Sequence, residues 1–535
     1  MNFLQKISIT RLVLIITVFL TVTGNTKFFS ETLVVYPWSD NVLFLVSLAI
    51  WLFSFLAILL LVVSYRYSVK PILIALLLIS SIVSYFANNY GIVIDDNMIA
   101  NSMETNMAES IDLFSLKLVF YFLILGVIPA YWVYKVQISH SKFSHQLWSK
   151  LKVIIILIVV FVVVTLTFSK SYTSFARENK QLRLHINPTY YLYAVGKYIN
   201  SQFETASIPF SKIGGDAKVV RGDKGKKLVI VIAGETARSD RFSLNGYHRQ
   251  TNPLLAKENV ISFKQMSSCG TDTALSLPCM FSSLNRENYS HAQGKNMSNV
   301  LDILSYAGVE VLWRDNNSSS KNVADRLPSQ NYKSDNINTV CDIECRDEGM
   351  LSDLQQYIDN YNDKDILIVL HTMGSHGPAY YKRYPRKFER FTPVCRTNQL
   401  NECTNEQINN AYDNTIVYTD YILSKTIEFL RNNQDEYRTA MFYMSDHGES
   451  LGENGLYLHG MPYFIAPEEQ TQVASVLWFG DKFSQEVDIT KLKNSSNKSF
   501  SHDGFFHTLL GLMNVRTDLY NKKLDFIPYM GFQSN

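Results

Sequence analysis

The sequence predicts a protein of two parts, an α-helical membrane domain with five transmembrane helices followed by an α/β domain outside the membrane. Long apolar runs are confined to the first 170 residues, and the later residues have the composition of a soluble domain. In that later portion, short β-branched runs alternate with helical patterns. A chain of 535 residues is long enough for a large core and a further module. Its net charge of +2 predicts no nucleic-acid partner.

Five apolar runs in the first part each approach the roughly 20 residues that a helix needs to cross about 30 Å of hydrocarbon. A cleavable signal peptide is the alternative for the first run, because Lys6 and Arg11 precede it. No small-residue cleavage site follows, so we favour an uncleaved anchor. The predicted spans are Leu12–Phe29, Val42–Ser64, Pro71–Asn88, Leu113–Tyr134 and Val153–Ser169.

The positions of the cations predict the orientation of these spans. The N-terminus, Tyr65–Lys70 and Lys135–Lys152 are short basic segments, and the intervening residues 25–40 and 91–112 carry more acid than base. Because basic segments stay in the cytoplasm, the N-terminus is expected there. An odd number of spans then places the chain after Ser169 on the opposite side.

All six cysteines lie in the later portion, where they form three near pairs. An even set of cysteines on the translocated side indicates disulfides in an oxidising compartment. We expect nearest neighbours to pair, as Cys269–Cys279, Cys341–Cys345 and Cys395–Cys403. A zinc site made of cysteines is the alternative, which the lack of a CxxC repeat disfavours.

We expect domain boundaries near residues 169 and 225, giving a membrane domain (1–169), a linker (170–225) and a catalytic domain (226–535). In the linker, Tyr190, Tyr191, Tyr193 and Tyr198 lie among basic residues. Such a pattern suits a helix in the lipid headgroup layer. A linker helix packed on the soluble domain explains it equally well. The stretch from Ile213 to Lys227 resembles a flexible hinge.

From Lys227 onward the pattern predicts a mostly parallel sheet with helices on both faces. In such sheets ligands bind beyond the carboxyl ends of the strands. The predicted strands are Leu228–Ala233, Val309–Trp313, Ile366–Leu370, Ala440–Met444 and Val473–Phe479.

A candidate nucleophile lies between Cys269 and Cys279, where Thr271 and Thr273 precede a predicted helix over residues 274–284. A hydroxyl at this place can use the unpaired N–H groups of the helix to receive a phosphate. The alternative is a loop that only caps the helix.

Carboxylates and imidazoles follow three of the predicted strands. Glu235 follows the first, the segment His371–Gly377 follows the third, and Asp446 and His447 follow the fourth. Oxygen and nitrogen donors collected at strand ends, together with a hydroxyl, suit a Zn²⁺ site. A single Asp–His pair is more often a loop hydrogen bond, so the prediction depends on several segments converging.

Several motifs in this order resemble those of the lipid A phosphoethanolamine transferases, a family that includes the mobile colistin-resistance enzymes. The resemblance covers nearly the whole chain and implies a catalytic domain of the alkaline phosphatase/sulfatase type, in the periplasm of a bacterium and anchored in its inner membrane. Asp272 departs from it, because many relatives have a small residue there. The motifs are Gly234–Arg238, Cys269–Ala274, Pro278–Met280, His371–Pro378, Ser445–Glu453 and Ser501–Asp503.

The resemblance assigns a role to each candidate residue. It implies that Thr273 is the nucleophile and that zinc is held by Glu235, Thr273, Asp446 and His447. It places His376 and His459 near the substrate phosphate or a second zinc ion. Shorter motifs match a substrate pocket, although position alone would make these residues ordinary polar groups of loops and surfaces. They are Asn101, Thr105, Glu109, Ser318 and Lys321.

The implied chemistry is transfer of phosphoethanolamine from phosphatidylethanolamine to a lipid A phosphate. Zinc lowers the pKa of a bound oxygen, which makes the Thr273 hydroxyl a competent nucleophile. His376 or His459 is a candidate to move the proton. Capping a phosphate with a zwitterion weakens attraction for cationic peptides, so polymyxin resistance is expected. We expect a monomer whose partners are these lipids.

Two other function classes stay open at this point. One is a related hydrolase of the sulfatase or phosphodiesterase kind, or a glycerophosphate transferase. The other is a membrane sensor whose external domain binds a metal or a sugar. His502 and Asp503 are left outside the predicted site, either as residues behind it or as the cap of a helix beginning near Phe505.

Overall fold

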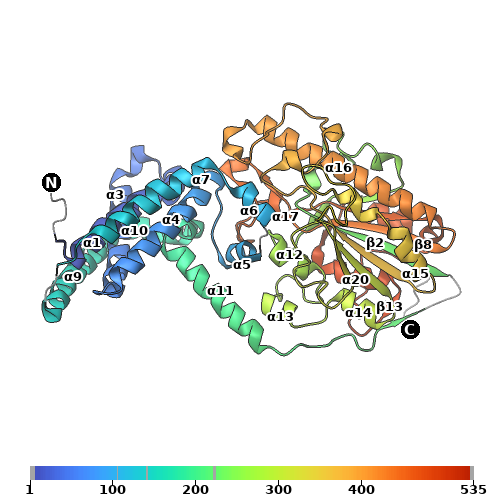
Figure 1. The fold of residues 1–535 in the computed structure, drawn as a ribbon, viewed down its shortest axis with the longest axis horizontal. Coiled ribbons are helices and arrows are strands. Elements are labelled where there is room, and N and C mark those ends of the chain that lie inside the picture. The colour runs from blue at the N-terminus through green and yellow to red at the C-terminus, as the bar shows by residue number, and fades with distance from the viewer. Residues whose placement is uncertain (1–5, 105–106, 140–141, 221–224, 531–535) are drawn as a thin grey trace. The chain divides into compact units, whose positions relative to one another are not determined.

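The protein forms two compact units in a computed structural model, which describes residues 6–104, 107–139, 142–220 and 225–530. The first unit comprises Met1–Asp96 and Phe114–Gly196, and the second comprises Asn97–Leu113 and Lys197–Asn535. Figure 1 follows the chain from its blue N-terminal helices to the sheet of the second unit. The short segment Asn97–Leu113, which lies between two membrane helices in the sequence, thus belongs to the second unit by its contacts.

The first unit is helical, and four of its helices are long and apolar enough to cross a membrane. They are Trp38–Val63, Val69–Tyr90, Leu116–Lys135 and Ser144–Thr167, which confirms four of the predicted spans. The first predicted span is instead a pair of helices, Ile9–Thr23 and Thr26–Val35, bent by 51°. The described residues therefore contain four spans, or five if the bent pair counts as one.

A buried asparagine lies at the bend. Asn25 is fully buried and its amide donates to the carbonyl of Leu20 at 2.9 Å and to that of Asn187 at 2.7 Å. The Asn187 amide in turn donates to Ser80 and Ser84, each at 3.1 Å. Because buried polar groups must be hydrogen-bonded, this network fixes the break between the two helices.

The helices of this unit have the following bounds, with a π-helix over Phe122–Val127 inside one span. They are α1 (Ile9–Thr23), α2 (Thr26–Val35), α3 (Trp38–Val63), α4 (Val69–Tyr90), α7 (Leu116–Tyr121), α8 (Ile128–Lys135), α9 (Phe143–Thr167), α10 (Ser169–Glu178) and α11 (Thr189–Ser207), the last of which continues into the second unit.

The second unit is built on a seven-stranded sheet of order β3-β11-β8-β2-β7-β5-β6. Its middle strands, from β8 to β6, are parallel, whereas β11 runs antiparallel to both β8 and β3. All five predicted strands are confirmed, and two short strands were not predicted. The strands are β2 (Lys226–Gly234), β3 (Ile261–Phe263), β5 (Glu310–Asp315), β6 (Ser329–Asn331), β7 (Ile366–His371), β8 (Tyr437–Ser445) and β11 (Ser475–Phe479).

Short two-stranded pairs complete the strands of this unit. β1 (Lys218–Val219) pairs with β13 (Val515–Arg516), and β9 (Ser450–Leu451) pairs with β10 (Tyr457–Leu458). The third pair is β4 (Gln265–Ser267) with β12 (Ser499–Ser501).

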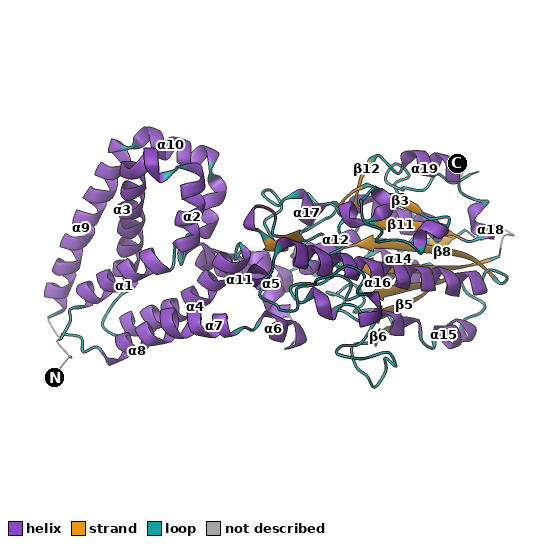
Figure 2. Cartoon of the chain, turned by 90° about the horizontal axis from the view of Figure 1, so that it is seen from above, coloured by secondary structure: helices purple, strands orange, loops and turns teal. Residues whose placement is uncertain are grey.

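Helices cover both faces of the sheet, as Figure 1 shows with α16 on one side and α14 and α20 on the other. In Figure 2 the orange strands lie between purple helices. Side chains that alternate along the central strands, such as Val229 and Val231, pack with Leu301 and Leu509 in one large apolar core. The main helices are α12 (Thr273–Met280), α13 (His291–Lys295), α14 (Val300–Tyr306), α15 (Leu354–Asn360), α16 (Asn405–Asn432) and α20 (Phe505–Leu512).

Shorter helices of the unit lie in its connections: α5 (Asp96–Glu104), α6 (Met107–Leu113), α17 (Glu468–Thr471), α18 (Asp481–Ser484) and α19 (Ile489–Ser495). Three disulfides join nearest neighbours, Cys269–Cys279, Cys341–Cys345 and Cys395–Cys403, which confirms the expected pairing.

Candidate active site

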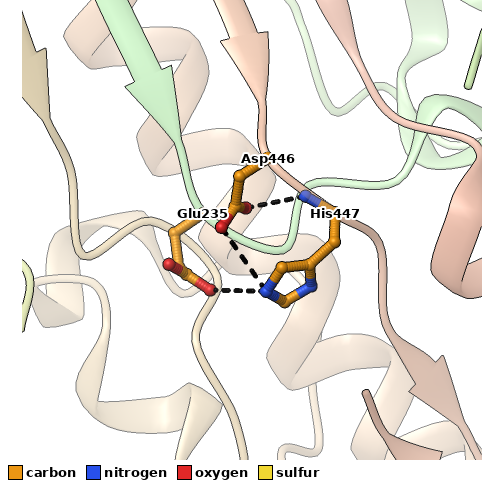
Figure 3. A group of neighbouring side chains, drawn as sticks. All are labelled: Glu235, Asp446 and His447. Atoms are coloured by element: carbon orange, nitrogen blue, oxygen red, sulfur yellow. Dashed lines mark hydrogen bonds and ion pairs between the residues drawn. The ribbon is translucent and has the colours of Figure 1, made fainter. Parts of the chain in front are cut away.

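Two adjacent strands bring the predicted metal ligands together. Glu235 directly follows β2, and Asp446 and His447 directly follow β8. Because Gly234 pairs with Ser445 in parallel register, the two strands end at the same level. The side chains of the three residues point toward one another (Figure 3), and their ligand atoms all lie within 4.8 Å of one another. All three side chains are buried. His447 Nε2 is 3.2 Å from Glu235 Oε1 and 3.5 Å from Asp446 Oδ2.

The Thr273 hydroxyl lies beside this group. Its oxygen is 3.1 Å from Glu235 Oε2 and 3.2 Å from His447 Nε2. Thr273 is the first residue of α12, whose N-terminus is capped by Asp272 through a 3.0 Å bond from the Leu275 N–H. The structure thus brings together all four residues that the sequence assigned to the metal, and it places the hydroxyl where a helix presents unpaired N–H groups.

The charges of the group favour a cation at its centre. Burial alone would raise the pKa of Glu235, but the hydrogen bond and charge of His447 lower it. Burial and the charge of Glu235 raise the pKa of Asp446, and the two carboxylates raise that of His447 against the effect of burial. Among the described residues, the buried Asp446 Oδ2 has no hydrogen-bond partner. An unpartnered carboxylate oxygen beside an imidazole and a second carboxylate fits a divalent cation bound by oxygen and nitrogen.

Asn317, which sequence reasoning missed, orients one of these ligands. Its amide donates to Glu235 Oε2 at 2.6 Å and to the Thr372 carbonyl at 2.9 Å, and its side chain is buried. Asn317 follows β5, at the same edge of the sheet as Glu235. The rule that polar residues at strand ends gather in one place could have found it.

A second buried pair consists of His371, which sequence reasoning noted at a strand end without giving it a role, and Asp315, which it did not single out. Both residues come from the ends of neighbouring strands, and His371 Nδ1 lies 3.2 Å from Asp315 Oδ2. Burial lowers the pKa of His371, but the charge and hydrogen bond of Asp315 raise it overall.

His502, which was left outside the predicted site, ties the nucleophile loop to β8. Its Nδ1 accepts the Cys269 N–H at 3.1 Å, and its Nε2 donates to the Ser445 carbonyl at 3.0 Å. Burial lowers the pKa of His502 to about 3, so the ring is neutral and can both accept and donate. Ser276 on α12 adds a bond to the Asp446 carbonyl at 2.6 Å.

The two predicted histidines lie next to the same group. The His459 ring centroid is 4.4 Å from that of His447 and 5.7 Å from that of His376. His459 Nδ1 is 2.7 Å from Glu449 Oε2, and Tyr380 donates to the other oxygen of Glu449 at 2.6 Å. His459 therefore has a carboxylate that orients its ring. His376 Nδ1 is buried and has no hydrogen-bond partner among the described residues.

The residues predicted for the substrate pocket divide into two sets. Lys321 is buried, with its Nζ 3.6 Å from Glu104 Oε2. Ser318 is half-buried, and its N–H donates to Asn317 Oδ1.

The second set lies on the segment Asn97–Leu113. Asn101 is half-buried on α5. Thr105 lies outside the described residues, and Glu109 belongs to α6 but its side chain is outside the description.

Comparison with known proteins covers both units. A family model described as Sulfatase matches residues 227–515, and one described as Phosphoethanolamine transferase EptA/EptB matches residues 52–203. The chain is 41% identical to Phosphatidylethanolamine transferase Mcr-1 of Escherichia coli, over 96% of this chain and 97% of that protein. It is 40% identical to Phosphoethanolamine transferase EptA of Escherichia coli, over 94% and 93%.

One solved structure matches almost the whole chain. It is the integral membrane protein lipooligosaccharide phosphoethanolamine transferase A from Neisseria meningitidis, with a TM-score of 0.94, 34% identity, and coverage of 98% of this chain and 99% of that one. Identity and coverage of this size, together with the two family models, leave one assignment. The chain belongs to the phosphoethanolamine transferases, multi-pass membrane proteins with a catalytic domain of the sulfatase fold.

Proposed function

We propose that this protein transfers phosphoethanolamine from phosphatidylethanolamine to a phosphate of lipid A through an intermediate on Thr273. The observation that supports this most is the position of the Thr273 oxygen, 3.1 Å from Glu235 and 3.2 Å from His447 at the start of α12. Both substrates are lipids, which gives a reason for joining a sulfatase-type domain to membrane helices. The catalytic domain, residues 226–535, works in the periplasm.

Zinc is the cofactor that we propose, held by Glu235, Thr273, Asp446 and His447, and when bound it acts as a Lewis acid that lowers the pKa of a nearby oxygen. The residues of the chain do the rest. The Thr273 hydroxyl donates to Glu235, which holds its oxygen in place for attack. The N–H groups of Thr273 and Ala274, the first two of α12, receive the phosphoryl oxygens, because these groups have no partner within the helix, whereas the Leu275 N–H is bound by Asp272.

In the first half-reaction the Thr273 oxygen forms a bond to phosphorus, and the bond from phosphorus to the glycerol oxygen breaks. Diacylglycerol leaves with a proton, and phosphoethanolamine remains on Thr273. His459 is placed to deliver that proton, since Glu449 at 2.7 Å orients its ring. In the second half-reaction an oxygen of the acceptor phosphate bonds to phosphorus, and Thr273 recovers its hydroxyl. His376, Asn101, Thr105, Glu109, Ser318 and Lys321 bind the substrates in this proposal.

The product carries a zwitterion where an anionic phosphate stood. Attraction between the membrane and cationic peptides falls accordingly, so cells that contain the protein become resistant to polymyxin. The protein acts as a monomer in this account.

Mass spectrometry of lipid A tests the proposal. Cells without an enzyme of this kind would express the wild type, Thr273→Ala, or Thr517→Ala as a control, whose hydroxyl bonds Asp216 and the Leu519 N–H, far along the chain from the candidate site. We expect phosphoethanolamine on lipid A with the wild type and the control, and none with Thr273→Ala. Release of phosphoethanolamine to water alone would indicate a hydrolase. Modification that persists in Thr273→Ala would remove Thr273 from its role.

A further inference from the structure

We propose that Lys295, Lys321 and Tyr289 form a subsite for the phosphate group of a lipid substrate, and that the carboxylate of Glu104 occupies this subsite when no substrate is bound. This inference rests on the proposed function and deepens it. Lys321 is already a candidate substrate residue. The new parts are the second lysine, the tyrosine, and the internal carboxylate that competes with the ligand.

Glu104, at the end of α5, lies between two cations. Its Oε1 is 3.3 Å from Lys295 Nζ, and its Oε2 is 3.6 Å from Lys321 Nζ. Both distances exceed the roughly 2.7–2.9 Å of a tight ammonium–carboxylate hydrogen bond. The carboxylate of Glu104 thus lies near both lysines and makes a tight hydrogen bond to neither. A phosphate group, with more oxygens, can approach both.

The burial of these groups is uneven. The side chain of Lys321 is only 2% exposed, whereas the side chains of Lys295 and Glu104 are 26% and 31% exposed. A buried ammonium needs an anionic partner, because desolvation is otherwise costly. Glu104 supplies that partner from the more open side, where an incoming anion can replace it.

Tyr289 offers a third donor, because its hydroxyl lies against Gly294, the residue before Lys295. Its hydroxyl is buried and has no hydrogen-bond partner among the described residues. Burial first, and then the charge of Glu104, raise the pKa of Tyr289, so the hydroxyl keeps its proton. Gly294 leaves room for this side chain, since a Cβ there would lie 2.4 Å from a ring carbon of Tyr289 and 2.4 Å from its hydroxyl oxygen. A buried donor without a partner is rare in folded proteins and calls for an unseen acceptor.

The subsite is joined to the catalytic residues by short connections. Lys321 comes four residues after Asn317, which donates to Glu235. Lys295 ends α13, a helix that packs against α12, whose first residue is Thr273. The donors therefore come from the segment that orients a metal ligand and from a neighbour of the nucleophile helix.

A phosphate group could come from either lipid, the phosphodiester donor or the phosphate monoester acceptor. Initial rates of the full chain in lipid nanodiscs separate the two, with the donor varied at saturating acceptor and then the reverse. The variants are Glu104→Gln, Lys295→Met and the double variant. We expect Glu104→Gln to lower one KM about threefold and Lys295→Met to raise the same KM about tenfold, the size expected for one charge-assisted hydrogen bond. The lipid whose KM moves is the ligand.

Three further measurements distinguish a role in phosphate binding from an ion pair that only stabilises the structure. In the double variant, Glu104→Gln should no longer lower the KM, because Lys295 is absent. The variant Lys295→Arg, which keeps the charge, should have a KM close to that of the wild type. Inorganic phosphate should inhibit Glu104→Gln at lower concentration than the wild type. Lys364→Met is the matched control, because it also removes a lysine that pairs with a glutamate, Glu310, at 2.9 Å. Lys364 lies just before the amino end of β7, whereas the candidate site lies at the carboxyl ends of the strands.

The proposal is overturned if Lys295→Met leaves both KM values unchanged, or if Glu104→Gln raises the KM as Lys295→Met does. Unchanged inhibition by inorganic phosphate would also contradict it. A wild-type protein that transfers nothing to lipid A would refute the proposed function instead, so the two failures are distinguishable.

Discussion

At the scale of single residues, Asn317 orients Glu235, the candidate metal ligand that faces the Thr273 hydroxyl. Its amide donates to Glu235 at 2.6 Å and leaves the carboxylate little freedom to rotate. Groups that orient a metal ligand in this way typically change metal affinity about 10–100-fold when they are removed. Asn317 therefore belongs to the site as much as the ligand it holds.

We expect Asn317→Ala to weaken zinc binding by about tenfold or more and to slow transfer, because Glu235 loses the amide that orients it. Competition between the metal-free protein and a zinc-binding dye measures the affinity. Asn288→Ala, which changes an exposed amide bonded only to Asn285 among the described residues, serves as control and should match the wild type. Equal zinc affinity in Asn317→Ala and the control would show that the hydrogen bond has no such role.

The resemblance supplied the four candidate ligands, and each of them lies next to a strand end or a helix start, where the chain itself fixes the position of the residue. Asn317 also lies just after a strand, but it is one amide in a run of polar residues, so no sequence pattern distinguished it from its neighbours. The role of His502 depends on two bonds to backbone groups of distant segments. Spacing along the chain contains no signal for such contacts.

At the scale of elements, the site depends on how α12 is held in position relative to the end of β8. His502 bonds the Cys269 N–H before the helix and the Ser445 carbonyl at the end of the strand. Ser276 on α12 bonds the Asp446 carbonyl at 2.6 Å. Two side chains thus set the distance between Thr273, the proposed nucleophile, and the candidate metal ligands.

We expect His502→Ala to lower the apparent unfolding temperature and the transfer rate together, because a buried N–H and a buried carbonyl lose their partners. Each unsatisfied group costs about 1–3 kcal/mol. Thermal denaturation of the purified protein measures the first effect and a transfer assay the second. His502→Gln keeps a donor and an acceptor and should recover part of both. A variant His502→Ala with wild-type stability and rate would contradict this account.

The strands that sequence reasoning found are long, apolar and fully buried, as β2 and β8 are. It missed β3 and β6, which have three residues each and too few positions for a periodicity. It also could not predict that β11 runs antiparallel to β8, because direction depends on how the connection crosses the sheet. The bend between α1 and α2 was not predicted for a similar reason, because Asn25 contacts Asn187, far along the sequence, only in the folded chain.

At the scale of the whole molecule, the distribution of basic residues predicts which side of the membrane each part occupies. Reporter fusions test it. Alkaline phosphatase fused after Gly215 should be active, because the enzyme requires an oxidising compartment, and fused after Ser68 in the basic turn it should be inactive. A green fluorescent protein should be fluorescent when fused after Ser68 and not fluorescent when fused after Gly215. Phosphatase activity at Ser68 would contradict the predicted orientation.

The central claim is that distant segments surround one cation and make the Thr273 oxygen the group that accepts phosphoethanolamine. Peptide mapping by mass spectrometry tests it most directly, on full-length protein incubated with phosphatidylethanolamine and no acceptor. We expect phosphoethanolamine on Thr273 when zinc is present, and none after a chelator has removed the metal. Phosphoethanolamine on another residue, or on Thr273 regardless of metal, would contradict the account.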